Sequence, residues 1–129
     1  MMMLKLSLLV AAGGAIGAVT RFWVGKLMVS SFGVASLWGT LAVNVVGCFL
    51  AGVFLAWSNM RSDTLELRAL VMVGFLGGLT TFSAFSVDAI TLWMRGEERF
   101  ATFYVLLSLL TSVLAVAVGV LVTRRFVLV

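Results

Sequence analysis

The amino-acid sequence predicts an all-α membrane protein with four transmembrane helices and a broken third helix, assembled as an antiparallel dual-topology homodimer. Three observations lead to this prediction. Hydrophobic residues make up 63% of the 129-residue chain and charged residues only 11%, a composition typical of proteins embedded in a bilayer. Four apolar runs reach the roughly 20 residues that a transmembrane helix needs. The basic residues divide almost evenly between the two ends of these runs. We expect one transmembrane domain over residues 1–129.

The first span is expected over residues 4–24. Gly13 and Gly17 are four residues apart and form the small-residue face that lets two membrane helices approach closely. A cleaved signal peptide is the alternative, because the run begins with one basic residue followed by apolar and small residues. We favour a retained helix, since the run continues past any plausible cleavage site to Arg21.

The second span is expected over residues 37–57, with Trp38 and Trp57 near its two ends as in an interfacial aromatic belt. Asn44 is the only amide within the spans, and Thr40 lies four residues before it on the same helix face. An amide in a membrane helix often joins two helices by hydrogen bonds. The alternative is that its NH₂ group, together with the Thr40 hydroxyl, faces a polar path.

The third span, expected over residues 68–93, contains a poor helical sequence at its centre, where residues 77–81 read GGLTT. The chain has no proline, so we expect glycine to cause a break in this helix. Free backbone groups at membrane depth are tolerated only inside protein or along a wet cavity, and broken helices often form ion sites. The half-helix that stops near Gly77 would offer carbonyl oxygens, and the half-helix that restarts would offer N–H groups.

Two phenylalanines, Phe82 and Phe85, follow the predicted break, and Ser83 adds a hydroxyl between them. Packing is the common role of such a pair. The positive edge of an aromatic ring also favours an anion without holding it too tightly. Both roles stay open for these residues.

The fourth span is expected over residues 100–123. Tyr104, Ser108 and Ser112 recur every four residues and form a hydroxyl stripe on one face. Membrane serines often bond to their own helix backbone. An aligned stripe is also what a path for water or ions requires.

Basic residues give little bias for orienting the four spans. One side holds five and the other holds four: Lys5, Arg61, Arg68, Arg124 and Arg125 against Arg21, Lys26, Arg95 and Arg99. Orientation is set by an excess of basic residues on one side. So small a difference predicts insertion in both orientations, and two opposite copies would form an antiparallel homodimer.

The remaining inventory excludes several classes of function. The chain has no histidine and one cysteine, Cys48, which rules out an internal disulfide and a cysteine-rich metal site; we expect this residue to pack in the core. No nucleophile–base pair or phosphate-binding loop supports an enzyme, and the net charge of +4 is interpreted as anchoring at the bilayer surface, with no nucleic-acid partner. Asp88 is the only carboxylate well inside a span. Donors and ring edges therefore dominate, which favours an anion.

Three segments resemble the signatures of the Fluc (CrcB) fluoride channels. Residues 13–22 read GGAIGAVTRF, residues 39–49 read GTLAVNVVGCF and residues 74–86 read GFLGGLTTFSAFS. The resemblance covers essentially the whole chain. It implies a homodimer in the plasma (inner) membrane with two antiparallel pores that export cytoplasmic fluoride passively.

The resemblance also implies roles for individual residues. Asn44, Phe82 and Phe85 would line the fluoride pore, and the hydroxyls of Tyr104, Ser108 and Ser112 would form a polar track. A structural Na⁺ at the dimer interface would be held by the main-chain carbonyls of Gly77 and Thr80, and Arg21 would draw anions into the pore vestibule.

Two positions depart from the family pattern: Ala84 replaces the usual hydroxyl residue, and Asp88 replaces a common glutamate. Two other functions were weighed. A small dual-topology four-helix multidrug exporter needs a carboxylate in its first span, and this chain has none there. A non-transporting membrane subunit would use Asn44 and the serine stripe only to join helices.

Overall fold

The computed structural model describes residues 1–32 and 36–127. Within these ranges it contains four helical spans that are long and apolar enough to cross a membrane. Three are single helices: α1 (Met2–Phe32), α2 (Ser36–Ser58) and α6 (Glu98–Val127). The third span consists of α3 (Leu65–Leu67), η1 (Arg68–Leu76), α4 (Gly77–Leu79) and α5 (Phe82–Met94). The four spans expected from the sequence are therefore present.

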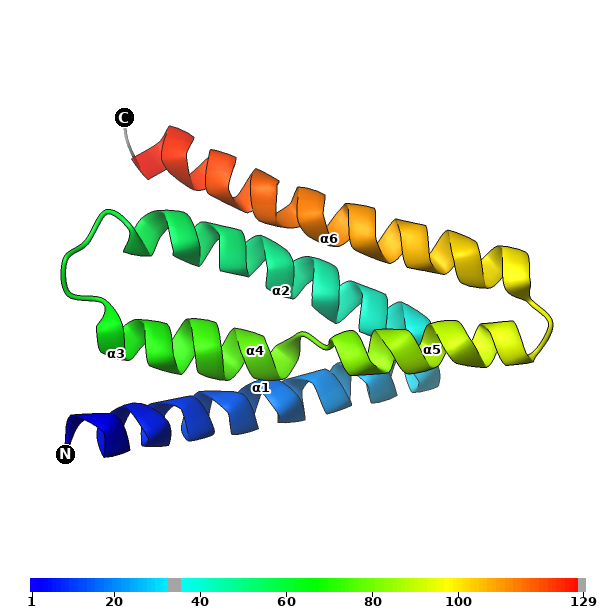
Figure 1. The fold of residues 1–129 in the computed structure, drawn as a ribbon, viewed down its shortest axis with the longest axis horizontal. Coiled ribbons are helices and arrows are strands. Elements are labelled where there is room, and N and C mark those ends of the chain that lie inside the picture. Colours follow the sequence, from blue (N-terminus) through cyan, green and yellow to red (C-terminus); the bar gives the residue numbers. More distant parts are fainter. Residues whose placement is uncertain (33–35, 128–129) are drawn as a thin grey trace.

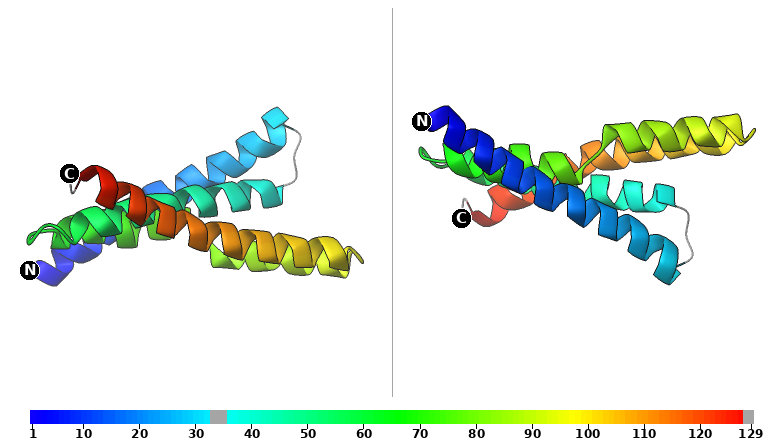
Figure 2. Two further views of the ribbon diagram at one scale, coloured as in Figure 1. Left: turned by 90° about the horizontal axis from the view of Figure 1, so that it is seen from above. Right: turned by 90° about the horizontal axis from the view of Figure 1, so that it is seen from below.

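The spans run alternately up and down, and both termini lie at the same end of the bundle (Figure 1). The bundle is not parallel throughout. In the views of Figure 2, the end of α1 and the start of α2 diverge from α5 and the start of α6, so the chain forms two arms joined near its centre. The third span passes through this centre, and its interruption lies where the arms separate.

Glycines bring α1 into backbone contact with the third span. A Cβ on Gly13 would lie 2.1 Å from the Leu70 carbonyl oxygen, and one on Gly17 would lie 2.1 Å from that of Phe75. No side chain fits at such distances, so only glycine permits this approach. The small-residue face expected on the first span is confirmed.

The first helix is longer than expected. The first span was expected to end at residue 24, but α1 continues to Phe32. The extension contains no proline, and Lys26 lies over the Phe22 ring at 5.7 Å, one turn earlier on the same helix. Gly39 of α2 packs closely on Gly25, where a Cβ on Gly39 would lie 3.2 Å from the Gly25 Cα. Contact with α2 therefore supports the added turns of α1.

The third helix breaks at threonine and not at glycine, so the expected cause was wrong. Gly77 and Gly78 are helical, whereas Thr80 has ψ 151° and Thr81 has φ −151° and ψ 117°, both extended. Gly78 instead packs on α1, because a Cβ there would lie 2.5 Å from the Gly14 carbonyl oxygen. The glycines serve helix contact, and the chain leaves the helix at the β-branched residues, which favour extended backbone.

After α3 the third span continues as a π-helix of nine residues, η1, which the sequence did not predict. π-helical turns are rare and occur frequently at functional sites. Here the π-helix leads directly into α4 and the break.

Candidate functional site

The break is held open by the Asn44 side chain. Its Oδ1 atom accepts a hydrogen bond from the Thr81 backbone N–H at 2.7 Å, and its Nδ2 atom donates to the Thr81 carbonyl oxygen at 3.0 Å. One amide therefore satisfies both main-chain groups of the residue at the centre of the break. Unpaired backbone groups in a membrane cost several kcal/mol each, so Asn44 stabilises the extended conformation of Thr81. It acts across helices, which was one of its two expected roles.

Main-chain carbonyls lose their helical donors at this point, and those of Gly77 and Thr80 are among them. In a continuous helix the Thr81 N–H would bond to the Gly77 carbonyl, but it donates to Asn44. The Ala84 N–H would bond to the Thr80 carbonyl, but it donates to the Thr81 Oγ1 atom at 3.1 Å, which caps the start of α5. The carbonyls of Gly77 and Thr80 are thus released from the helical pattern.

A cavity of about 230 Å³ lies against the break, between α2, α5 and α6. Its lining is mostly apolar with a few polar groups: Asn44, Cys48, Thr80, Thr81, Phe82, Phe85, Ser108, Leu109, Ser112 and Val113. Five of the eight predicted pore residues meet here, namely Asn44, Phe82, Phe85, Ser108 and Ser112. An apolar chamber with few converging polar groups is the usual form of a small-ligand site.

The two phenylalanines form a pair on one wall of the cavity. Their ring centroids lie 5.3 Å apart with an interplanar angle of 49°. Phe85 is 7% exposed and its ring contacts Tyr104, whereas Phe82 is 73% exposed. Packing within the chain therefore explains the position of the Phe85 ring, but it does not explain that of the Phe82 ring.

Ser108, on the α6 side of the cavity, has an enclosed hydroxyl. The residue is only 5% exposed, and its Oγ atom has no hydrogen-bond partner within the described residues. Thr111, on the same helix, bonds instead to the Leu107 carbonyl of its own backbone at 2.6 Å. Thr111 thus bonds to its own helix backbone, as membrane hydroxyls often do, whereas Ser108 does not. A buried polar group without a partner calls for a ligand or a water molecule.

The other predicted residues of the pore and its vestibule do not line this cavity. Tyr104 lies one turn from Ser108 and is fully buried, with its hydroxyl 3.4 Å from both the Leu37 carbonyl and the Asp88 carboxylate, longer than a normal hydroxyl hydrogen bond. The Ser83 hydroxyl lies 3.1 Å from that of Thr81, on the exposed side of the break. Thr40 and Arg21 are partly exposed on α2 and α1, and neither lines the cavity.

Cys48 is the cavity residue that the sequence analysis assigned wrongly. It was expected in the core, but it is partly exposed and lines the cavity one turn after Asn44. Its four-residue spacing from Asn44 was the available signal, because residues four apart share a helix face.

No group of three or more His, Cys, Asp or Glu side chains gathers into a metal-binding cluster within residues 1–32 and 36–127.

Most of the sequence matches a known protein family. The family described as "CrcB-like protein, Camphor Resistance (CrcB)" matches residues 8–120. A protein of Rhizobium etli named "Fluoride-specific ion channel FluC" is 50% identical over 122 residues, which cover 94% of this chain and 98% of that protein. Proteins of the same name from Rhizobium johnstonii and Agrobacterium fabrum are 51% and 45% identical, covering 92% and 91% of this chain and 95% and 94% of theirs. The chain belongs to the CrcB family.

Proposed function

We propose that this chain forms a fluoride-selective channel of the plasma membrane that releases cytoplasmic fluoride passively. It is a multi-pass membrane protein, and its relatives over more than nine-tenths of its length carry the name of a fluoride-specific channel. The observation that carries the proposal is the cavity at the break, which Asn44, the two phenylalanines and two serines of α6 line together.

The chemistry of the cavity suits a small, strongly hydrated anion. A pore must replace the water that fluoride loses, and each polar group left unpaired in an apolar setting costs a few kcal/mol. The hydroxyls of Ser108 and Ser112 and the second N–H of the Asn44 amide supply donors, while the ring edges of Phe82 and Phe85 add a weak positive field. The mostly apolar walls offer little to a larger anion. Conduction also requires that binding stays weak enough for the ion to leave.

We further propose an antiparallel homodimer with two pores. The exposed fraction of Phe82 leaves one side of the cavity uncovered within a single chain. Val87 and Ile90, on the same helix, are 65% and 61% exposed. A second copy would cover these side chains, and the nearly equal division of basic residues permits it to insert in the opposite orientation.

The released carbonyls of Gly77 and Thr80 support a structural Na⁺ at the interface of this dimer. A bound Na⁺ would supply positive charge that balances the carbonyl dipoles. Asn44 and Thr81 keep these carbonyls out of the helical hydrogen-bond pattern, and the Thr80 hydroxyl is turned back to the Leu76 carbonyl at 2.8 Å. The ligands that we propose for this ion are therefore the two main-chain oxygens.

Parallel efflux measurements test the function. The purified protein is placed in liposomes loaded with fluoride and chloride, and both ions are followed with electrodes. We expect rapid fluoride release and retained chloride. Release of both ions, or of neither by well-folded protein, would contradict the proposal.

A multidrug exporter is disfavoured, because such a protein needs a carboxylate in its first span and α1 contains none among residues 2–32.

Dual topology has its own test. Lys26 is exposed near one end of α1, so a Lys26→Cys variant on a Cys48→Ser background can be labelled from either face of the cell membrane. We expect an impermeant reagent to label part of the population from outside and the rest only after permeabilisation. Labelling confined to one side would exclude the antiparallel pair.

A further inference from the structure

An apolar groove lies between the second half of α2 and η1. Aliphatic and aromatic side chains of both helices line it, among them Leu50, Phe54 and Trp57 of α2 and Val71 and Phe75 of η1. Its volume is about 270 Å³, and Leu50 is 39% exposed, so the groove opens at the surface of the chain. Its walls offer almost no polar atoms to a ligand, and it therefore suits a hydrocarbon chain.

Two arginines flank one end of this groove. The guanidinium of Arg61 lies over the Trp57 ring, with its Cζ atom 4.9 Å from the ring centroid. Arg68 begins η1, and its Nη2 atom donates a hydrogen bond at 3.2 Å to the Oδ1 atom of Asn59, the residue after the end of α2. Tryptophan is enriched where a membrane protein meets the headgroups of the bilayer. The end of the groove at Trp57 is therefore expected at headgroup level.

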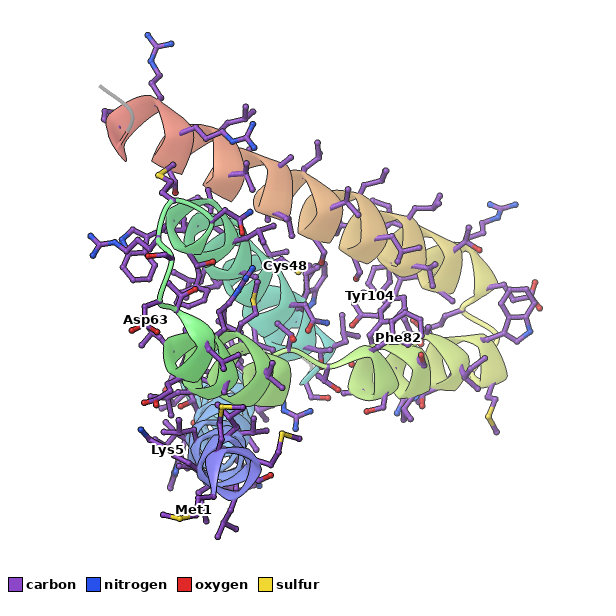
Figure 3. All side chains as sticks on the ribbon, turned by 60° about the vertical axis from the view of Figure 1, so that its left-hand side comes forward. Met1, Lys5, Cys48, Asp63, Phe82 and Tyr104 are labelled. Carbon is purple, nitrogen blue, oxygen red and sulfur yellow. The ribbon has the colours of Figure 1, made fainter. Side chains whose placement is uncertain are left out.

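The carboxylates at the same end of the bundle lie elsewhere. Asp63 and Glu66 border a different hollow, which Leu9 of α1 also lines, and Glu66 forms an ion pair with Lys5. Figure 3 shows Lys5 and Asp63 at this end of the bundle, near the start of α1. The two arginines at the groove form no ion pair with a carboxylate in the described part of the chain. Their positive charges are therefore available to an anionic group.

We propose that this groove binds one anionic phospholipid of the surrounding bilayer. Its phosphate group lies between Arg61 and Arg68, and one acyl chain lies in the groove. A guanidinium presents its N–H donors in a planar fork that matches phosphate oxygens. From Trp57 to Leu50 the helix α2 rises about 10 Å, at about 1.5 Å per residue, so the groove runs from the headgroups into the hydrocarbon region, as an acyl chain does. The proposal does not rest on the function as a channel.

The groove lies away from the surface assigned to the second copy. At about 100° per residue, the four residues of α2 that line the groove lie on average roughly 150° around the helix from Asn44 and Cys48, which line the cavity at the break. The second copy proposed above would cover Phe82, beside that cavity. The groove on the other side of α2 therefore stays open to lipid.

The experiment counts the lipids that stay bound to the full-length protein. Protein in detergent is mixed with equal amounts of phosphatidylglycerol and phosphatidylcholine that carry the same acyl chains. Native mass spectrometry then measures how much of each lipid remains per chain. We expect retention of phosphatidylglycerol to exceed that of phosphatidylcholine by at least about tenfold, because two cationic side chains meet the anionic headgroup.

Two double variants test the charges at the groove. Arg61→Gln with Arg68→Gln removes both positive charges and should bring the two lipids to nearly equal retention. Arg124→Gln with Arg125→Gln is the matched control, because it removes the same charge from the last turn of α6, at the same end of the bundle, without changing the groove. The control should keep the native preference. Equal losses of preference in the two double variants would overturn the proposal, because the lipid would then follow the overall charge of this end.

A second pair of variants tests the acyl chain. Leu50→Trp fills part of the groove, whereas Leu110→Trp adds the same side chain to a position of α6 that is 62% exposed and does not line the groove. We expect Leu50→Trp to lose bound lipid severalfold and Leu110→Trp to retain it. Native retention by Leu50→Trp would overturn the proposal. A native protein that retains no lipid, and that Leu50→Trp converts to a monomer, would also overturn it and assign the groove to a second copy.

Discussion

The two halves of the third span differ in what covers them. The first half, η1 and α4, packs along α1 through glycines, and a Cβ on Gly74 would lie 2.9 Å from the Val10 carbonyl oxygen. The second half, α5, packs on α6 and α2, while α1 diverges from it (Figure 2). Its first side chain, Phe82, is 73% exposed. The first half is therefore packed closely against α1, whereas the second half carries an exposed side chain that the proposed pore and the proposed second copy would cover.

Replacing a glycine at the contact between α1 and the first half of the third span should have the largest effect on stability. Gly17→Val places a side chain where even a Cβ would lie 2.1 Å from the Phe75 carbonyl and 2.8 Å from the Leu79 backbone nitrogen. Backbone cannot yield as a side chain does, so we expect a loss of about 3 kcal/mol or more of stability. The measurement is the yield and melting temperature of monodisperse protein. A variant that folds normally and only loses flux would show that this backbone contact can separate without a loss of stability.

Asn44→Asp should damage both the break and the flux. The carboxylate can still accept from the Thr81 N–H, but it cannot donate to the Thr81 carbonyl, 3.0 Å from Nδ2 in the native chain. A buried acceptor left unpaired costs about 1–3 kcal/mol. We expect a lower melting temperature and fluoride efflux reduced by at least about tenfold, to which the added negative charge contributes. Native efflux at an unchanged melting temperature would show that Asn44 neither stabilises the break nor lines the path of the ion.

Ser108→Ala should reduce fluoride efflux severalfold without destabilising the protein. The substitution deletes a buried hydroxyl that has no partner, and removal of an unsatisfied polar group is neutral or stabilising. Thr111→Val is the matched control, because Thr111 bonds to its own helix at the Leu107 carbonyl and should leave efflux unchanged. If Ser108→Ala lost stability and kept its efflux, the hydroxyl would have a structural partner outside the chain.

Gly25→Ala should have the smallest effect, and in the opposite direction. Nothing lies within 4 Å of a Cβ at Gly25, although this residue is on the same helix as Gly17. Alanine is more favourable than glycine in a helix interior by about 0.5–1 kcal/mol. A slightly higher melting temperature with unchanged efflux is expected. Destabilisation here would mean that another copy packs closely on this part of α1.

The number of spans and the presence of a break could be predicted from the sequence, because both depend on local composition. The position of the break could not. Helix propensity pointed to Gly77 and Gly78, but these residues stay helical in contact with α1, and the Asn44 amide binds Thr81 from a different helix. Such contacts between distant residues leave no local signal. For the same reason the longer α1, supported by α2, was missed.

The site was predicted in part. Asn44, Phe82, Phe85, Ser108 and Ser112 line one cavity, as residues of a common site should. Helix periodicity placed Tyr104 in the same stripe as Ser108, yet its ring packs against Phe85, outside the cavity lining. Periodicity gives the face of a helix but not the depth at which a cavity ends. Cys48 shares the face of Asn44, but an isolated cysteine in an apolar run carried no further signal.

The most direct test of the account compares one exposed side chain from each half of the third span. Phe82→Ile removes the aromatic ring beside the cavity and keeps much of its volume, a change that usually costs under about 1.5 kcal/mol. Val73→Ala trims a side chain of η1 that is 60% exposed and does not line the cavity. Initial fluoride efflux from liposomes should fall about tenfold for Phe82→Ile, because the ring edge is lost, and stay at the native rate for Val73→Ala, with both melting temperatures near native. Native efflux from Phe82→Ile, or an equal loss in the two variants, would contradict the assignment of the second half to the ion path.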